Sequence, residues 1–197
     1  MENQKITIRQ IIKIYRYAKK VETKARFNHS KRVAEVSVML SKKFHLDKNT
    51  ALYAALAHDI CKHYDRDLMI KTASRSGNEI YDYQKNDFHS LHGVAASVIL
   101  KEEFFIQNKE LLEAVECHVG AKIGMNDYSK ILYIADKSEP KRKHATKEYR
   151  KKLFSYNLTQ MVAMVLDNAL EYIINKGYTP YPGSKEIVDY YKKEAGF

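Results

Sequence analysis

Histidine and aspartate residues occupy positions where helical periodicity predicts buried, apolar side chains. His29 precedes Val33 by four residues and Val36 by seven, which places all three on one face of a helix. His118 follows Val115 by three residues, again on one helical face. The residues that share this inward placement are His29, His58, Asp59, His92, His118 and Asp136. The sequence therefore predicts a group of imidazoles and carboxylates inside the protein.

Metal binding is the chemistry that would stabilise such a group. An unpaired carboxylate buried away from water costs several kcal/mol, whereas a bound cation supplies the missing charge. Four imidazoles and two carboxylates are enough ligands for two divalent ions, with one carboxylate bridging them. Because the ligands are nitrogen and oxygen without a thiolate, iron, manganese, cobalt, nickel and zinc all remain open.

The remaining histidines are weaker candidates. A single histidine on an apolar face is more often a hydrogen-bonded core residue than a ligand, so the prediction depends on the joint pattern. His45 and His63 are flanked by polar residues, and we expect them at the surface or behind the ligands. His144 lies in a basic stretch and is expected to have no site role. His89 precedes His92 by three residues on the same face, so both a site role and a structural role stay open.

Helical periodicity over nearly the whole chain would position these side chains. Asp47 and Asn126 are suitable N-caps, and Gly177 and Pro180 can end the long helix that begins near Asn157. Residues 72–86 are the least helical region and predict a loop or a broken helix. The predicted helices contain residues 8–15, 29–44, 47–58, 92–99, 111–118, 126–136, 157–173 and 184–194.

Composition agrees with one all-α domain. The 197 residues are 45% hydrophobic and 29% charged, and 7 Gly and 3 Pro leave little room for a many-stranded fold. We find no linker or repeat, so we predict a single domain over residues 1–197, with its core at about 10–180. Charged residues interrupt every apolar run, which argues against a membrane span. Cys61 and Cys117 form neither zinc-finger nor redox spacing, and a cytoplasmic location is the simplest expectation.

The formal net charge of +10 favours an anionic ligand. The densest basic stretch, residues 141–152, lacks interleaved aromatic residues that would stack on bases. We therefore interpret it as a solvated helix face after a loop and expect no nucleic-acid partner. A homodimer is compatible with the sequence.

The order of the inward residues resembles the H…HD…D signature of HD-domain metal-dependent phosphohydrolases. His29, His58–Asp59 and Asp136 supply that signature. Local sequences over roughly residues 10–180 narrow the resemblance to the bacterial YqeK-type branch, the symmetrical bis(5′-nucleosyl)-tetraphosphatases. That branch commonly has Thr at the position of Val119 and Ile at that of Ser138, and neither departure removes a ligand. The segments that carry the resemblance are NHSKRVA (28–34), HDICK (58–62), LHG (91–93), HVG (118–120) and ADKSEPKR (135–142).

The resemblance implies a helical HD-domain bundle with a dinuclear metal site in its core. The six inward residues would hold two iron ions, with Asp59 as the bridge. The implied substrate is diadenosine tetraphosphate, cleaved between its central phosphates to give two ADP.

Basic residues near the metals are the candidates for contacting phosphate, because phosphoryl transfer depends mostly on positioning and charge neutralisation. Lys62 follows His58 by one helical turn and is the leading candidate, with Arg142 next. The predicted catalytic residues are Asp59, Lys62 and Arg142, and the predicted substrate-binding residues are Arg26, Arg32, Lys62, Lys137 and Arg142. Tyr83 and Phe88, beside the irregular region, are candidates for stacking on a base.

Two alternative functions follow from the same residues. HD-type nucleotidases, deoxynucleoside triphosphatases and cyclic-nucleotide phosphodiesterases would keep the site and change the substrate. A non-enzymatic nucleotide- or RNA-binding module would account for the charge of +10. It would leave the six inward ligand-type side chains without a purpose.

Overall fold

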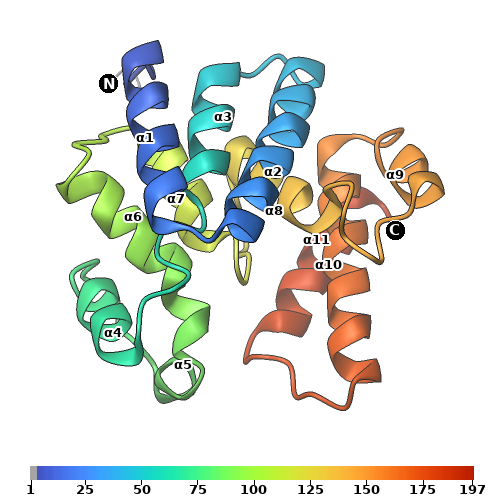
Figure 1. Cartoon of the computed structure of the whole chain (residues 1–197). Helices are drawn as coiled ribbons and strands as arrows, with labels where there is room; N and C mark the ends of the chain where they lie inside the picture. Colours follow the sequence, from blue (N-terminus) through green and yellow to red (C-terminus); the bar gives the residue numbers. More distant parts are fainter. Residues whose placement is uncertain (1–3) are drawn as a thin grey trace.

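Helices make up most of the computed structural model, which describes residues 4–197 (Figure 1). That range contains no β-strand, so the predicted all-α fold is confirmed. The predicted single domain over 1–197 includes residues 1–3, which lie outside the described residues. The elements are α1 (Ile8–Val21), α2 (Lys24–Lys43), α3 (Lys48–Ala57), α4 (Arg66–Ser74), α5 (Asp82–Asn86), the 3-10 helix η1 (Phe88–Leu91), α6 (His92–Glu102), α7 (Lys109–Cys117), α8 (Asp127–Ser138), α9 (Lys147–Leu153), α10 (Leu158–Asn175) and α11 (Ser184–Ala195).

Side-chain caps fix where the helices that carry site residues begin. Asp47 and Asn126 accept hydrogen bonds from backbone N–H groups of the first turns of α3 and α8, as predicted. α3 and α7 end at Ala57 and Cys117, so the next residues, His58 and His118, are the C-caps. Two of the predicted ligands therefore lie at helix ends.

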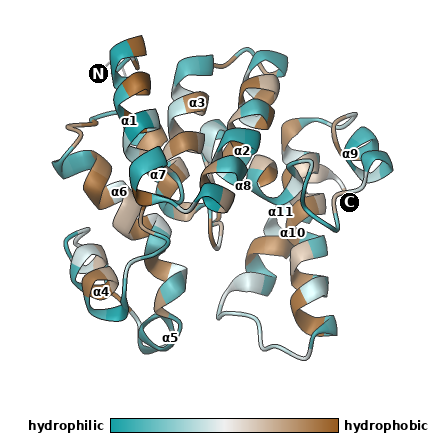
Figure 2. Cartoon of the chain, in the orientation of Figure 1, coloured by the Kyte–Doolittle hydropathy of each residue, from teal (hydrophilic) through white to brown (hydrophobic). Residues whose placement is uncertain are grey.

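A central group of helices surrounds the predicted site. α2 packs against α3 and α8, and α7 packs between α6 and α8. Fully buried residues such as Leu40, Leu111 and Leu132 fill the space between them. Most helices carry both hydrophobic and hydrophilic stretches, as amphipathic helices do (Figure 2).

The spacing of Ile8, Ile11, Ile12 and Tyr15 predicts that these residues form the apolar face of the first helix. The helix is confirmed, but the predicted buried face is wrong. Ile8, Ile12 and Tyr15 are 62%, 47% and 39% exposed, while Ile14 and Ala18 are fully buried. α1 packs against α3, and Ile14 and Ala18 are the residues that it buries. Periodicity alone could not decide which face of α1 is buried, because apolar residues lie on both faces of this helix.

The region predicted to be irregular, residues 72–86, is a broken helix. α4 ends at Ser74, and α5 begins at Asp82. The sequence analysis missed α4, which Asp65 caps and which buries Met69. The basic stretch 141–152 consists of a loop followed by α9, as expected. Within residues 4–197 we find no helix with the length and apolar character needed to cross a bilayer.

Candidate metal centre

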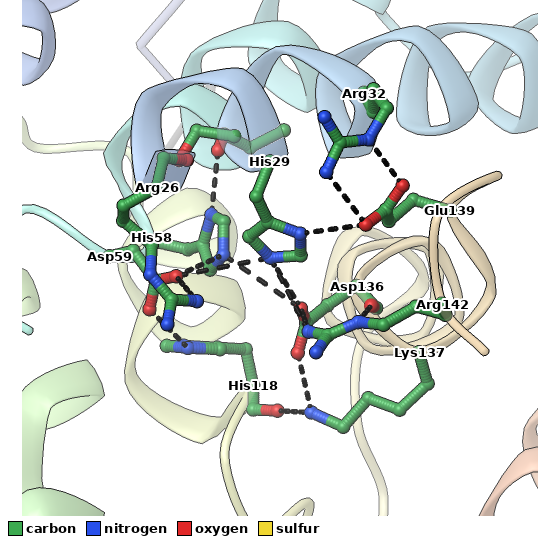
Figure 3. Close-up of polar contacts among 12 residues, drawn as sticks. Arg26, His29, Arg32, His58, Asp59, His118, Asp136, Lys137, Glu139 and Arg142 are labelled. Atoms are coloured by element: carbon green, nitrogen blue, oxygen red, sulfur yellow. Dashed lines mark hydrogen bonds and ion pairs between the residues drawn. The ribbon is translucent and has the colours of Figure 1, made fainter. Parts of the chain in front are cut away.

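The six inward residues converge from five helices (Figure 3, which labels all of them except His92). His29 lies within α2, and Asp136 lies near the end of α8. His92 is the first residue of α6, whereas His58 with Asp59 and His118 follow the ends of α3 and α7. All six are buried, with 6% as the largest exposed fraction. The structure thus brings together every residue that the sequence predicted as a ligand.

Asp59 lies at the centre of this group. Its Oδ2 is 3.2 Å from Nε2 of His58 and 3.9 Å from Nε2 of His29. Its Oδ1 is 3.1 Å from Nε2 of His92 and 3.9 Å from Nε2 of His118. One carboxylate therefore faces all four imidazoles with its two oxygens, which is the placement that a bridging ligand requires.

Asp136 supplies the second carboxylate at one end of the group. Its Oδ1 lies 2.9 Å from Nε2 of His29 and 4.0 Å from Nε2 of His58. Two overlapping triads have ligand atoms that all lie within 4.8 Å of one another: His29, His58 and Asp136, and His58, Asp59 and His118.

The outer nitrogen of each imidazole is held by an oxygen that only accepts hydrogen bonds. Nδ1 donates to a backbone carbonyl three residues earlier in His58 (2.7 Å), His92 (2.6 Å) and His118 (2.7 Å). In His29, Nδ1 lies 3.1 Å from Oε1 of Glu139. Because Nδ1 keeps a proton in each ring, Nε2 is the nitrogen that faces inward, and it offers a lone pair whenever the ring is neutral.

These inward lone pairs fit divalent metal ions. Nε2 of His58 is buried and has no hydrogen-bond partner, although Asp59 lies beside it. Nε2 of His92 and Nε2 of His118 are 3.0 Å apart. Two lone pairs facing each other at this distance repel, and a cation between them would turn the repulsion into attraction.

The electrostatics of the group keep most ligands in the form that binds metal. Burial would raise the pKa of Asp59, but His58 and its other imidazole neighbours hold it well below the ordinary value. Burial, with His92 and His58 nearby, holds the pKa of His118 well below 6.5. The pKa of His92 is also lowered, mainly by burial. Ionised carboxylates and neutral imidazoles are the states that coordinate metals.

The pKa of His58 shifts in the opposite direction from those of His92 and His118. Its complete burial would lower its pKa, but the adjacent Asp59 carboxylate reverses the direction and raises it. A metal ion arriving at Nε2 of His58 must therefore displace a proton more often than at the neighbouring rings.

Four of the predicted phosphate-binding cations line the group. Nη1 of Arg26 is 2.9 Å from Oδ2 of Asp59, and Nζ of Lys137 is 2.7 Å from Oδ2 of Asp136. Arg142 contacts Oδ1 of Asp136 with one terminal nitrogen, and its Nε donates to the backbone oxygen of Asp136 at 2.7 Å. Nζ of Lys62 lies 3.2 Å from Nδ1 of His92, and burial lowers the pKa of Lys62. Arg26, Lys137 and Arg142 are more exposed than the acids they contact, so they lie between the buried group and solvent.

The family model of the HD domain matches residues 26–141, more than half of the chain, and this range contains all six inward residues. The chain belongs to the HD domain family.

Relatives of this HD domain share most of its length. It is 28% identical over 92% of this chain to a Staphylococcus aureus protein named symmetrical bis(5′-nucleosyl)-tetraphosphatase, of which the match covers 94%. A Bacillus subtilis protein of the same name is 24% identical over 81% of this chain and 86% of its own length. A crystal structure from Clostridium acetobutylicum, described as that of a predicted HD superfamily hydrolase involved in NAD metabolism, superimposes with a TM-score of 0.85. That chain is 27% identical, and the match covers 93% of this chain and 97% of that one.

Glu139 is a site residue of this HD domain that the sequence analysis missed. It is 2% exposed, receives the His29 Nδ1 contact, and accepts hydrogen bonds from Arg32 (2.5 and 3.1 Å) and from the backbone of Lys141 (2.7 Å). Burial would raise its pKa, but Arg32 and these donors lower it to about 2. A carboxylate behind a ligating histidine fixes the ring's tautomer and orientation. Its position three residues after Asp136 was the only signal in the sequence.

Arg32 therefore has a different partner from the other predicted phosphate-binding residues. Its guanidinium holds Glu139 with two hydrogen bonds, and within residues 4–197 it forms no hydrogen bond or ion pair with Asp59 or Asp136. This geometry favours a role in orienting His29, and the substrate-binding role stays a prediction.

Gly93 allows α6 and α7 of the HD domain to approach closely. A Cβ atom there would lie 2.6 Å from the backbone oxygen of Glu116, 2.8 Å from that of Val115 and 3.1 Å from Nδ1 of His118. Only glycine avoids these collisions, so Gly93 lets His92 and His118 come together. The LHG segment (91–93) alone does not reveal this reason for its glycine.

The remaining histidines lie outside the group. His45, His63 and His144 are exposed, and Nε2 of His144 contacts the backbone oxygen of Lys137 at 2.8 Å. The side chain of His89 is exposed as well, but its backbone carbonyl anchors His92. Its contribution to the site is therefore structural.

Proposed function

We propose that this HD domain hydrolyses dinucleoside polyphosphates in a metal-dependent reaction, and that it cleaves diadenosine tetraphosphate between the central phosphates to give two ADP. The observation that carries the proposal is the buried group of four inward Nε2 atoms and two carboxylates, lined on its solvent side by cations. The names of the relatives from Staphylococcus aureus and Bacillus subtilis support this choice of substrate.

We further propose that the group holds two iron ions, with His29, His58, Asp59, His92, His118 and Asp136 as ligands and Asp59 as the bridge. Divalent ions in such a site lower the pKa of water and neutralise charge on phosphoryl oxygens. The nitrogen and oxygen donors support iron, and manganese, cobalt, nickel and zinc suit the same donors. We place the reaction in the cytoplasm.

The cations would position the polyphosphate. Arg26, Lys137 and Arg142 contact carboxylates of the group and are partly exposed, so each can turn to a phosphate oxygen when substrate arrives. Arginine suits this role because its planar guanidinium can donate two parallel hydrogen bonds to one phosphate. Lys62 adds a charge beside His92. Together these residues would neutralise the phosphate chain and hold its centre over the buried ligands.

The leaving group requires charge neutralisation more than a proton. Symmetrical cleavage expels ADP, whose terminal phosphate is a stable anion near neutral pH. Arg142 and Lys137, which contact Asp136, would stabilise the charge that develops on it. Asp59 is the candidate for accepting a proton during attack, in addition to its ligand role.

Product analysis on a substrate panel tests the proposal. The purified protein, supplied with iron or manganese, would be incubated with diadenosine tetraphosphate, nucleoside monophosphates and triphosphates, and cyclic dinucleotides, and the products separated by chromatography. We expect ADP as the sole product from diadenosine tetraphosphate. AMP together with ATP would contradict symmetrical cleavage, and faster turnover of another panel member would assign the site a different substrate.

A further inference from the structure

We propose that Tyr81, Tyr83 and Tyr181 form a stacking platform for a nucleobase of the substrate. The inference rests on the proposed function, because it assigns a binding site to the part of a dinucleoside polyphosphate that the metal centre does not contact. We call these three residues the tyrosine platform.

The three rings form one continuous aromatic cluster. Tyr81 and Tyr83 are stacked, with ring centroids 5.7 Å apart and an interplanar angle of 6°. Tyr83 and Tyr181 are 5.5 Å apart at 39°. Tyr81 and Tyr83 belong to the start of α5, whereas Tyr181 lies in the connection between α10 and α11 (Figure 1 shows both elements). Two segments far apart in the sequence thus meet through aromatic rings.

The cluster remains accessible although its members touch one another. Tyr81 is 50% exposed, and Tyr83 and Tyr181 are each 36% exposed. Large ring faces in water are unfavourable unless something covers them for part of the time. A planar base matches the shape of these faces, and base–aromatic stacking is strong while accepting any base.

A short connection links the platform to the candidate metal centre. The hydroxyl of Tyr181 donates a hydrogen bond to Asp87, the residue that precedes η1. η1 leads directly into His92 of the candidate metal centre. Four residues of 3-10 helix rise about 8 Å. Along the chain, only η1 therefore separates Asp87, which holds Tyr181, from His92, a predicted metal ligand.

The Tyr181 hydroxyl is suited to hold this arrangement. Burial and the neighbouring Asp87 raise the pKa of Tyr181 to about 12, so the hydroxyl keeps its proton at neutral pH and donates it to the carboxylate. This hydrogen bond fixes the α10–α11 connection against η1. The ring of Tyr181 can then complete a surface that α5 alone would not provide.

Alanine variants of the platform test the proposal through binding and kinetics. The probes are ADP, measured by calorimetry on the metal-loaded protein, and diadenosine tetraphosphate, measured by initial rates. We expect Tyr83→Ala and Tyr181→Ala each to weaken ADP binding and to raise KM by about 5-fold to 100-fold. We also expect kcat and metal content to stay near wild type. Tyr83→Phe keeps the ring and should bind ADP like wild type.

The matched control is Tyr178→Ala, which removes a tyrosine from the same connection. Tyr178 is 67% exposed, and none of the aromatic ring contacts within residues 4–197 involves it. Its removal should leave ADP binding unchanged. Inorganic tripolyphosphate, which has no base, should bind equally well to all variants, because the cations and metals are intact.

The outcomes separate this inference from the proposed function. Unchanged ADP affinity in both alanine variants, with native circular dichroism spectra, would overturn the platform even if the protein hydrolyses diadenosine tetraphosphate. Equal losses for ADP and tripolyphosphate would overturn it as well, because they would indicate damage to the metal centre. An inactive wild-type protein would refute the proposed function, while weaker ADP binding in the alanine variants would still support the platform.

Discussion

Glu22, a buried carboxyl beside the candidate metal centre, leads to a specific prediction about stability and pH. It is the C-cap of α1 and is 7% exposed. Its Oε2 accepts a hydrogen bond from Ser30 at 2.9 Å, whereas Oε1 is buried without a partner. Burial raises its pKa from 4.5 to about 7, although Ser30 acts in the opposite direction. The folded protein therefore favours the protonated form of Glu22.

The direction of the pH dependence follows from this raised pKa. A carboxyl with a higher pKa in the folded state contributes stability that is fully present below the unfolded value of 4.5 and is lost as the pH rises through about 7. Each pKa unit corresponds to about 1.4 kcal/mol, so the loss is about 3 kcal/mol. Glu22→Gln removes the ionisable group and keeps the shape. We expect this variant to be more stable than wild type at about pH 8 by up to about 3 kcal/mol.

Urea denaturation followed by circular dichroism measures the effect. The metal-free proteins would be compared at about pH 5 and about pH 8, because bound cations would themselves change the charge near Glu22. The advantage of Glu22→Gln should be small at the lower pH and large at the higher one. Glu186→Gln, which removes an exposed carboxyl, is the control and should show no such difference. An equal advantage of Glu22→Gln at both pH values would refute the reasoning.

Three further substitutions test other parts of the structure. Gly93→Ala should lower the free energy of unfolding by about 1–3 kcal/mol and weaken metal binding, because the added Cβ would meet the backbone of α7; unchanged stability would show that the two helices can separate freely. Glu139→Gln should weaken metal affinity by about 10-fold to 100-fold, measured by titration with manganese, since a neutral amide holds His29 less firmly; wild-type affinity would remove the positioning role of Glu139. Lys62→Ala should raise KM or lower kcat for diadenosine tetraphosphate while metal content stays the same, and loss of metal would show that its role is misassigned.

The sequence predicted the parts of the fold that depend on local patterns. The helix starting after Asn126 was predictable because its cap and its apolar spacing agree. The orientation of α1 was not, because Ile12 and Ile14 offer two competing apolar faces and only packing against α3 decides between them. α4 was missed because its only buried residues are Met69, Thr72 and Ala73, which leaves a weak apolar pattern.

The candidate site also has residues that the sequence could predict and residues that it could not. The six inward residues were predictable, because a histidine or aspartate at an apolar position of a helical pattern can be recognised from the sequence alone. Glu139 and its pairing with Arg32 were not predictable, since this carboxylate acts through His29, which is 110 residues away in the sequence. The reason for Gly93 is also invisible in the sequence, because it depends on carbonyl groups of another helix. Contacts between distant segments require the folded structure.

Locating the metals in crystals of the protein is the most direct test of the central claim. Crystals grown with iron or manganese would be measured at the absorption edge of that metal, and wild type would be compared with His58→Ala and Asp59→Ala. We expect two anomalous peaks in wild type, both within coordination distance of Asp59, and loss of most metal and of hydrolysis in the variants while helical content stays intact. Wild-type crystals with no peak among the six residues, or variants that keep full activity, would contradict the claim that this cluster is a dinuclear metal centre.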